Sequence, residues 1–266
     1  MRAFAPGSVT AVFAPAETAD QSKGASVAIA DGVVADVQRA EDESAARGAP
    51  VVTVGGEPTA FEPVEIALRE LDVPARADLT AEVPIGSGFG ASGAATLAAV
   101  IAANGEFDLA LSREEVVELA HRAEVEAGTG LGDVFVQNRG GLVVGDGGDP
   151  RKFERETPIE YSSFGPIATD EALADDDLMR RVAREGSATL DALPDDPSLA
   201  RLTRDSWAFA EAIDLPTEEV RRAVEEVEAA GGAASMAMVG ETVFAVGVEG
   251  VLQHRTEVCP DGAELR

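Results

Sequence analysis

The chain has 266 residues, with 49 acidic side chains against 21 Lys and Arg, so its formal charge is −28. This length allows one large domain or two modest ones, and a hydrophobic fraction of 45% excludes an intrinsically disordered chain. A pI near 4.2 argues against a nucleic-acid partner, because binding to phosphate backbones needs basic surface. No apolar run approaches the ~18 residues of a membrane span, and the N-terminus lacks the pattern of a secretory signal.

The use of cysteine and lysine indicates the environment of the protein. Cys259 is the single cysteine, which excludes a disulfide framework and a cysteine-based zinc site and fits a reducing cytoplasm. Only two of the basic residues are lysines, and acidic residues are spread over the whole chain. A surface of this kind is typical of a salt-rich cytoplasm, where screening removes the repulsion between like charges. We therefore expect a cytoplasmic protein of a salt-loving organism.

The first half of the chain is rich in predicted strands. Residues 25–30 and 33–37 form a predicted hairpin, because Asp31-Gly32 between them is a sequence that favours a type I′ turn. Residues 51–54 form a short predicted strand that ends at a glycine pair. A further strand is predicted at 79–83, directly before Pro84.

Two helices of different character follow. Residues 92–103 are apolar on nearly every side, which predicts a helix buried all round. Ser112 and Glu115 have the spacing of a capping box, and Gly128 has the place of a helix C-cap, so a second helix is predicted between them. A short strand is predicted at 141–144.

The second half is predicted to be mainly helical, with helices at 175–193, 198–213 and 217–230. A hairpin is predicted at its end, with strands 235–239 and 242–248 joined at Gly240-Glu241. The change of pattern near residue 160 suggests two domains, 1–160 and 161–266, in an α+β protein.

The glycine-rich segment 84–95, Pro-Ile-Gly-Ser-Gly-Phe-Gly-Ala-Ser-Gly-Ala-Ala, carries the strongest chemical signal. Glycines let backbone N–H groups approach an anion, and the start of the buried helix adds its free N–H groups, so phosphate is the expected ligand. A dinucleotide fingerprint is also present, but no strand ending in an acid follows the helix. No lysine follows the glycines either, which excludes a Walker-type P-loop.

This segment resembles the phosphate loop of the GHMP kinases. Two other segments agree with the resemblance: Ala5-Pro6-Gly7, placed before a short predicted strand, and the reduced glycine-rich segment 231–238. Ser8 stands where many members carry lysine. The resemblance implies the two-domain GHMP fold, with an N-terminal domain like ribosomal protein S5 and a C-terminal α/β sandwich. It also implies that ATP and Mg²⁺ are used to phosphorylate the hydroxyl group of a small molecule.

Glu124 is unusual among its neighbours, since it belongs to an otherwise apolar stripe of its predicted helix, with Val117, Ala120 and Ala127. An acid that faces the core needs a compensating charge, for which a metal ion is well suited, although a glutamate reaching out to solvent is the alternative.

The resemblance assigns roles to named residues. Glu124 and Ser92 correspond to Mg²⁺ ligands. Asp133, after the glycine-rich turn 128–132, corresponds to the catalytic aspartate. Asp133 either deprotonates the substrate hydroxyl or only stabilises the transition state. The residues expected to contact the phosphates of ATP are Pro84, Gly86, Ser87, Gly88, Gly90, Ala91, Ser92 and Gly93.

Lys23 and Arg139 are the candidates for pairing with a substrate carboxylate, although an exposed surface position is the simpler interpretation of each. The sequence does not decide which small molecule is phosphorylated, and homoserine, mevalonate and shikimate stay open as substrates. It also leaves open a regulator with this fold that binds a nucleotide without catalysis. We expect a small-molecule substrate, with no nucleic-acid or membrane partner, and a homodimer stays open.

Overall fold

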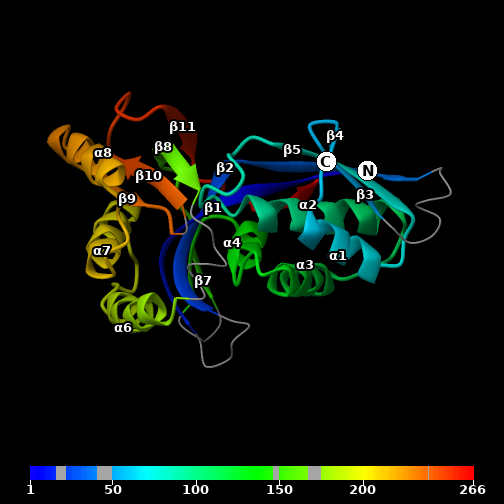
Figure 1. Cartoon of the computed structure of the whole chain (residues 1–266), viewed down its shortest axis with the longest axis horizontal. Helices are drawn as coiled ribbons and strands as arrows, with labels where there is room; N and C mark the ends of the chain where they lie inside the picture. Colours follow the sequence, from blue (N-terminus) through cyan, green and yellow to red (C-terminus); the bar gives the residue numbers. More distant parts are fainter. Residues whose placement is uncertain (16–21, 41–49, 146–149, 167–174, 239) are drawn as a thin grey trace.

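The computed structural model describes residues 1–15, 22–40, 50–145, 150–166, 175–238 and 240–266. These residues form two β-sheets, each accompanied by its own helices (Figure 1). The long strands β1 (Arg2–Pro15) and β2 (Ser22–Arg39) pair with each other and extend from one group of helices to the other (Figure 1). The mixture of helices and sheets confirms the predicted α+β class.

The first sheet has the strand order β12-β1-β2-β5-β3-β4, and β6 pairs with both β2 and β7. Its pairs are antiparallel except for β3 with β5, which is parallel. Besides β1 and β2 it contains β3 (Val51–Val54), β4 (Glu57–Pro58), β5 (Ala75–Ala81), β6 (Leu142–Gly145), β7 (Arg151–Phe153) and β12 (Glu264–Leu265).

Four helices cover one face of this sheet: α1 (Glu62–Glu70), α2 (Ala91–Glu106), α3 (Arg113–Ala127) and α4 (Asp133–Arg139) (Figure 1). Helix α2 packs between the sheet and α3 and is buried almost throughout, as its composition predicts. Both bonds of the capping box at Ser112 are present, and Gly128 ends α3 in the left-handed conformation. Local sequence therefore determined both ends of α3.

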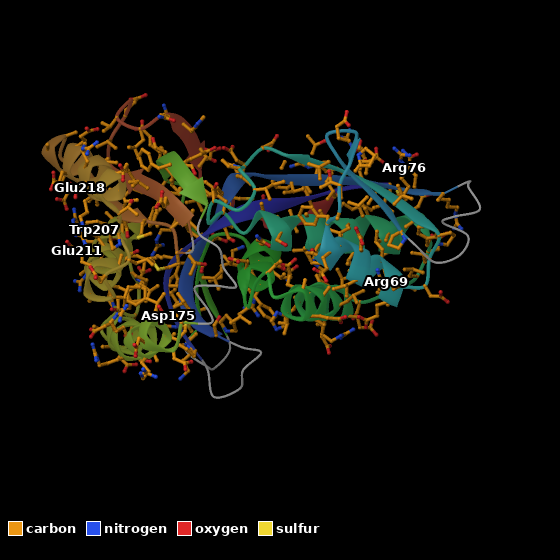
Figure 2. All side chains as sticks on the ribbon, viewed as in Figure 1. Arg69, Arg76, Asp175, Trp207, Glu211 and Glu218 are labelled. Atoms are coloured by element: carbon orange, nitrogen blue, oxygen red, sulfur yellow. The ribbon has the colours of Figure 1, made fainter. Side chains whose placement is uncertain are left out.

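The second sheet has the order β11-β8-β10-β9. Its strands are β8 (Pro158–Pro166), β9 (Ala233–Met236), β10 (Gly240–Val246) and β11 (His254–Glu257), accompanied by α6 (Asp176–Asp191), α7 (Leu199–Ala212) and α8 (Glu218–Ala229). The side chains of Asp175, Ser198 and Thr217 cap these three helices. Glu211 and Glu218 lie on the outside of this region (Figure 2). The proposed boundary near residue 160 falls within β8.

Among the described residues, no helix combines the length and apolar character that crossing a membrane requires.

Strands β1 and β2 contribute to two separate hydrophobic cores. Ala3 and Ala5 belong to the core beneath α2, whereas Val9 and Val12 belong to the core shared with the second sheet. The change occurs at an irregularity between Pro6 and Gly7, where the register with β2 shifts. A bulge bends a strand, and here it directs the same strand pair from one core into the other.

The predicted hairpin at Asp31-Gly32 is wrong. Residues on both sides of this dipeptide belong to the single strand β2, which pairs with β1 along its length. Gly32 does not have the positive φ of a type I′ turn. It is instead required by close packing, because a Cβ atom there would lie 2.2 Å from the carbonyl oxygen of Ala5.

Two other local predictions need correction in part, although the predicted pairing of the late hairpin is confirmed, because β9 and β10 are antiparallel neighbours. Gly240 and Glu241 lie within β10 and do not form the turn of the predicted hairpin. A Cβ atom on Gly240 would lie 2.3 Å from the carbonyl of Ser87, so this glycine allows β10 to approach the glycine-rich loop. Ala5-Pro6-Gly7 lies inside the long strand β1 and not before a short one.

Candidate active site

A cavity of about 720 Å³ lies where the glycine-rich loop, α4 and the ends of β1 and β2 meet. Its lining includes Thr10, Phe13, Lys23, Ser26, Gly86, Gly88, Gly90, Ala91, Ser92, Thr129, Gly130, Asp133, Phe135, Val136, Val143, Pro150 and Met238.

The glycine-rich loop connects β5 to α2 and exposes the N-terminus of α2 to the cavity. Gly86, Gly88 and Gly90 all have positive φ, with values of 77°, 83° and 58°. Gly90 is the N-cap of α2 and offers no side chain, so no side-chain bond occupies the first N–H groups of this 16-residue helix. Unoccupied N–H groups at a helix N-terminus form a site for phosphate.

The predicted phosphate-binding residues divide into two groups. Those that line the cavity are Gly86, Gly88, Gly90, Ala91 and Ser92. Ser87 is buried against β10 and Gly93 against α4, while Pro84 is an exposed residue at the beginning of the loop. The residues of this second group do not line the cavity.

The three segments that carry the family resemblance come together at this loop. The N–H of Ser8 donates to the carbonyl of Phe89 at 2.8 Å, and the N–H of Met238 donates to the carbonyl of Thr10 at 3.1 Å. A Cβ atom on Gly88 would lie 3.2 Å from the carbonyl oxygen of Met238. Residues from both ends of the chain therefore support the loop.

Glu124 faces inward from α3, as its place in the apolar stripe predicts, and only 2% of it is exposed. Its carboxylate accepts hydrogen bonds from three hydroxyl groups: Ser92 at 2.9 Å, Thr96 at 2.8 Å and Thr129 at 2.9 Å. Burial, with a smaller contribution from the nearby charge of Asp133, raises the pKa of Glu124 to about 7. The three hydrogen bonds oppose this rise.

The surroundings of Glu124 fit a hard cation. Ser92 provides a hydroxyl oxygen that lines the cavity, and directly beneath it Glu124 provides a buried carboxylate without a cationic partner among the described residues. Oxygen ligands of this kind suit Mg²⁺, which also neutralises a buried negative charge.

Asp133 is the first residue of α4 and lines the cavity beside the phosphate loop. Its Oδ1 accepts hydrogen bonds from the hydroxyls of Ser8, at 2.9 Å, and Thr10, at 3.3 Å. Burial raises the pKa of Asp133, and these two bonds oppose the rise. Gly90 leaves room for this group, because a Cβ atom there would lie 3.0 Å from Cγ of Asp133.

The two candidates for a substrate carboxylate are placed differently. Lys23, from β2, lines the cavity, and among the described lining residues it is the one cation. Arg139 is exposed at the end of α4, where its guanidinium donates to the carbonyl of Pro150 at 2.8 Å. Arg139 is the last residue of α4 and Asp133 the first, so the helix separates them by ~9 Å along its axis, and Arg139 does not line the cavity.

Several polar partners of the two acids do not follow from the sequence. Ser8, Thr10 and Gln137 surround Asp133, and Thr96 and Thr129 complete the environment of Glu124. Ser8 and Asp133 are 125 residues apart, and no local pattern connects such positions. The sequence contains one signal for these partners, which is the serine at position 8, where many members of the family carry lysine.

Comparison with known proteins agrees with this geometry. Residues 60–141 match the family model described as the GHMP kinases N terminal domain. A protein of Methanospirillum hungatei named pantoate kinase is 30% identical, in an alignment that covers 96% of this chain and 91% of that protein. The chain belongs to the GHMP kinase family. GHMP kinases are ATP-dependent kinases, which is consistent with a phosphate loop as the densest motif of the chain.

Two further comparisons cover nearly the whole length of this GHMP kinase. Pantoate kinase of Thermococcus kodakarensis is 29% identical, covering 92% of this chain and 87% of its own length. A solved structure titled phosphotransferase related to CoA biosynthesis pathway superposes with a TM-score of 0.83 at 24% identity, covering 99% of this chain and 97% of that one. This superposition confirms the GHMP kinase fold.

Proposed function

We propose that the protein transfers the γ-phosphoryl group of ATP to the primary hydroxyl of pantoate, giving 4-phosphopantoate for coenzyme A synthesis. The proposal rests chiefly on the full-length relationship to proteins named pantoate kinase. The cavity supports it, because a phosphate site, an acid and a cation line the same space.

The phosphates of ATP lie against the start of α2 in this proposal. Their negative charge meets the free N–H groups after Gly90 and the positive end of the helix dipole. Ser92 and Glu124 would hold Mg²⁺, which would neutralise part of the negative charge on the phosphates.

Asp133 directs the hydroxyl of pantoate towards the γ-phosphorus. The hydroxyl oxygen forms the new bond to phosphorus, the bond from phosphorus to the bridging oxygen of ADP breaks, and Asp133 takes the hydroxyl proton. Its raised pKa suits it to accept a proton better than an exposed aspartate. Positioning and charge neutralisation supply most of the rate in reactions of this type.

The other end of the cavity fits the remainder of pantoate. Lys23 provides a partner for the carboxylate. Apolar side chains that line the cavity provide contacts for the two methyl groups beside the reacting carbon, namely Phe13, Phe135, Val136, Val143 and Pro150. A site that combines a cation with apolar walls distinguishes pantoate from alcohols that carry an additional charge.

A panel of substrates tests this function. We expect ADP release with pantoate to be at least ~10²-fold more efficient by kcat/KM than with homoserine, mevalonate or pantothenate, measured with ATP and Mg²⁺ in molar KCl. Homoserine carries an ammonium group that pantoate does not have, and pantothenate lacks the carboxylate that Lys23 binds. A preference for homoserine or mevalonate would keep the kinase mechanism and contradict pantoate as substrate.

The role of Lys23 has an internal control, because the chain contains one other lysine. Lys23→Met is expected to raise the KM for pantoate ~10-fold or more and to leave the KM for ATP unchanged. Lys152→Met removes an equal charge outside the cavity, where the ammonium group donates to backbone carbonyls of Arg139 and Pro260. If both variants change the pantoate KM equally, Lys23 is not the carboxylate partner.

A further inference from the structure

Gln137 is a fully buried amide in α4, one turn after Asp133. Its side chain does not line the cavity, yet its Nε2 contacts two parts of the site. Nε2 donates to the carbonyl of Gly90 at 2.7 Å and to the hydroxyl oxygen of Ser8 at 3.2 Å. One amide group therefore connects the N-cap of the phosphate helix with the hydroxyl that binds Asp133.

The chemistry of these groups fixes the direction of each hydrogen bond. An amide nitrogen can only donate, so the oxygen of Ser8 must accept from Gln137. The single proton of Ser8 is then directed to Oδ1 of Asp133, 2.9 Å away. We call this sequence of bonds, from Gln137 to Ser8 to Asp133, the hydrogen-bond chain.

The hydrogen-bond chain leaves the second carboxylate oxygen of Asp133 for the substrate. Oδ1 already accepts from Ser8 and Thr10, and no bond from the described residues is recorded at Oδ2. Oδ2 lies beside Gly130, which lines the cavity, at 3.7 Å from the position that a Cβ atom would take there. Asp133 is thereby held with one oxygen fixed and the other directed to the cavity side.

The energetic cost of Gln137 argues against a purely structural role. Within the described part of the chain, its Oε1 is buried without a hydrogen-bond partner, which is unfavourable in a protein interior. Gly93 admits this oxygen, because a Cβ atom there would lie 2.9 Å from it. A leucine or methionine would fill a similar volume without an unpaired oxygen, so the two bonds from Nε2 are what the amide contributes.

We propose that Gln137 is a positioning residue for phosphoryl transfer, which orients the hydroxyl of Ser8 and so holds Asp133 in the geometry that receives the substrate hydroxyl. The proposal rests on the proposed function, since it assigns Asp133 to the substrate alcohol. It adds a residue outside the cavity to the catalytic machinery, and it explains why a serine suffices at position 8.

The test is a double-mutant cycle between Gln137→Met and Ser8→Ala. Each single variant is expected to lower kcat ~10-fold, with the KM for ATP and nucleotide binding by calorimetry within twofold of wild type. The double variant is expected to be no slower than Ser8→Ala alone, because both changes break the same hydrogen-bond chain. Ser8→Thr, which keeps the hydroxyl, is expected to retain most of the activity.

Thr53→Val is the matched control, since it removes another buried hydroxyl that donates to a carboxylate, Asp78, at 2.6 Å and away from the cavity. It is expected to lower the melting temperature without changing kcat. A kcat of Gln137→Met within twofold of wild type, or losses that multiply in the double variant, would overturn the proposal. If Gln137→Met does not fold, full activity of Ser8→Ala overturns it as well.

The proposed function can fail separately. If the wild-type protein prefers another alcohol to pantoate, the same cycle is measured with that alcohol and still decides the role of Gln137. If the wild type phosphorylates no alcohol in the panel, both proposals are wrong.

Discussion

Two buried glutamates, one in each half of the molecule, have opposite electrostatic environments. Glu124 lies beneath the phosphate loop and is 2% exposed, and Glu160 lies in β8 of the second sheet and is 4% exposed. Three side-chain hydroxyls donate to Glu124. Three consecutive backbone N–H groups, at residues 250–252, donate to Glu160.

Burial, hydrogen-bond donors and neighbouring charges together produce the difference in pKa. Burial raises the pKa of Glu160, but the backbone bonds and the charge of Arg255 outweigh this effect and lower it below its usual value. The pKa of Glu124 rises to about 7 despite its three bonds. Backbone N–H groups are fixed in direction and can only donate a hydrogen bond, whereas hydroxyl groups can rotate and can also accept one. The folded backbone therefore stabilises the ionised form of Glu160. The ionised form of Glu124 has no cationic partner among the described residues.

The largest expected effect concerns Asp133, whose hydroxyl donors resemble those of Glu124. Asp133→Asn should lower kcat by ~10²-fold or more with little change in ATP binding, because the acid acts mainly in the transition state. Steady-state ADP release and nucleotide titration measure the two quantities. A variant that keeps half of the wild-type rate would remove the catalytic assignment.

Glu124→Gln should have a smaller effect, confined to the cation. We expect the Mg²⁺ concentration for half-maximal activity to rise ~10-fold, since one charged ligand is lost while the phosphate loop stays intact. The melting temperature without Mg²⁺ should not fall, because no buried charge loses a partner. Activity with unchanged Mg²⁺ dependence, in a variant whose circular dichroism matches wild type, would contradict the metal role.

Glu160→Gln should change stability and leave catalysis intact. Replacing the carboxylate leaves backbone donors around residue 251 without their acceptor, which should lower the free energy of unfolding at pH 7 by ~1 kcal/mol, with kcat unchanged. Urea unfolding in molar KCl measures the difference. A lowered kcat with unchanged stability would reverse the comparison between the two acids.

The pH dependence of that difference gives a further, smaller signal. The pKa of Glu160 is lowered in the folded protein, so its ionised form stabilises the fold above the pKa of the unfolded chain. This contribution is lost as the pH falls through the folded pKa. The stability difference between wild type and Glu160→Gln should therefore shrink when the unfolding measurement is repeated at progressively lower pH, and a difference that grows would contradict the assignment.

Sequence reasoning succeeded where the determining contacts are local. The capping box at Ser112, the buried helix α2 and the inward orientation of Glu124 depend on residues within one or two helical turns. It failed at Asp31-Gly32, since a dipeptide that favours a turn is equally suited to a bulge when a long partner strand is available. That partner, β1, cannot be read from the dipeptide.

The candidate site shows the same division. The phosphate loop was identified from closely spaced glycines, but the placement of Arg139 depended on the extent of α4, whose first and last residues are known only from the structure. Gln137 gave no local signal, because its partners Ser8 and Gly90 are 129 and 47 residues away. Interactions between side chains so distant in sequence require the fold before they can be seen.

The shared strands β1 and β2 also determine how the molecule must come apart. Since Ala3 and Ala5 stabilise one core while Val9 and Val12 stabilise the other, neither core can melt without removing part of the second. Unfolding is therefore expected to be cooperative across both sheets and to give one calorimetric transition. A fragment that ends near residue 160 carries the long strands but loses α6 and α7, which pack against β1, and it should not fold alone.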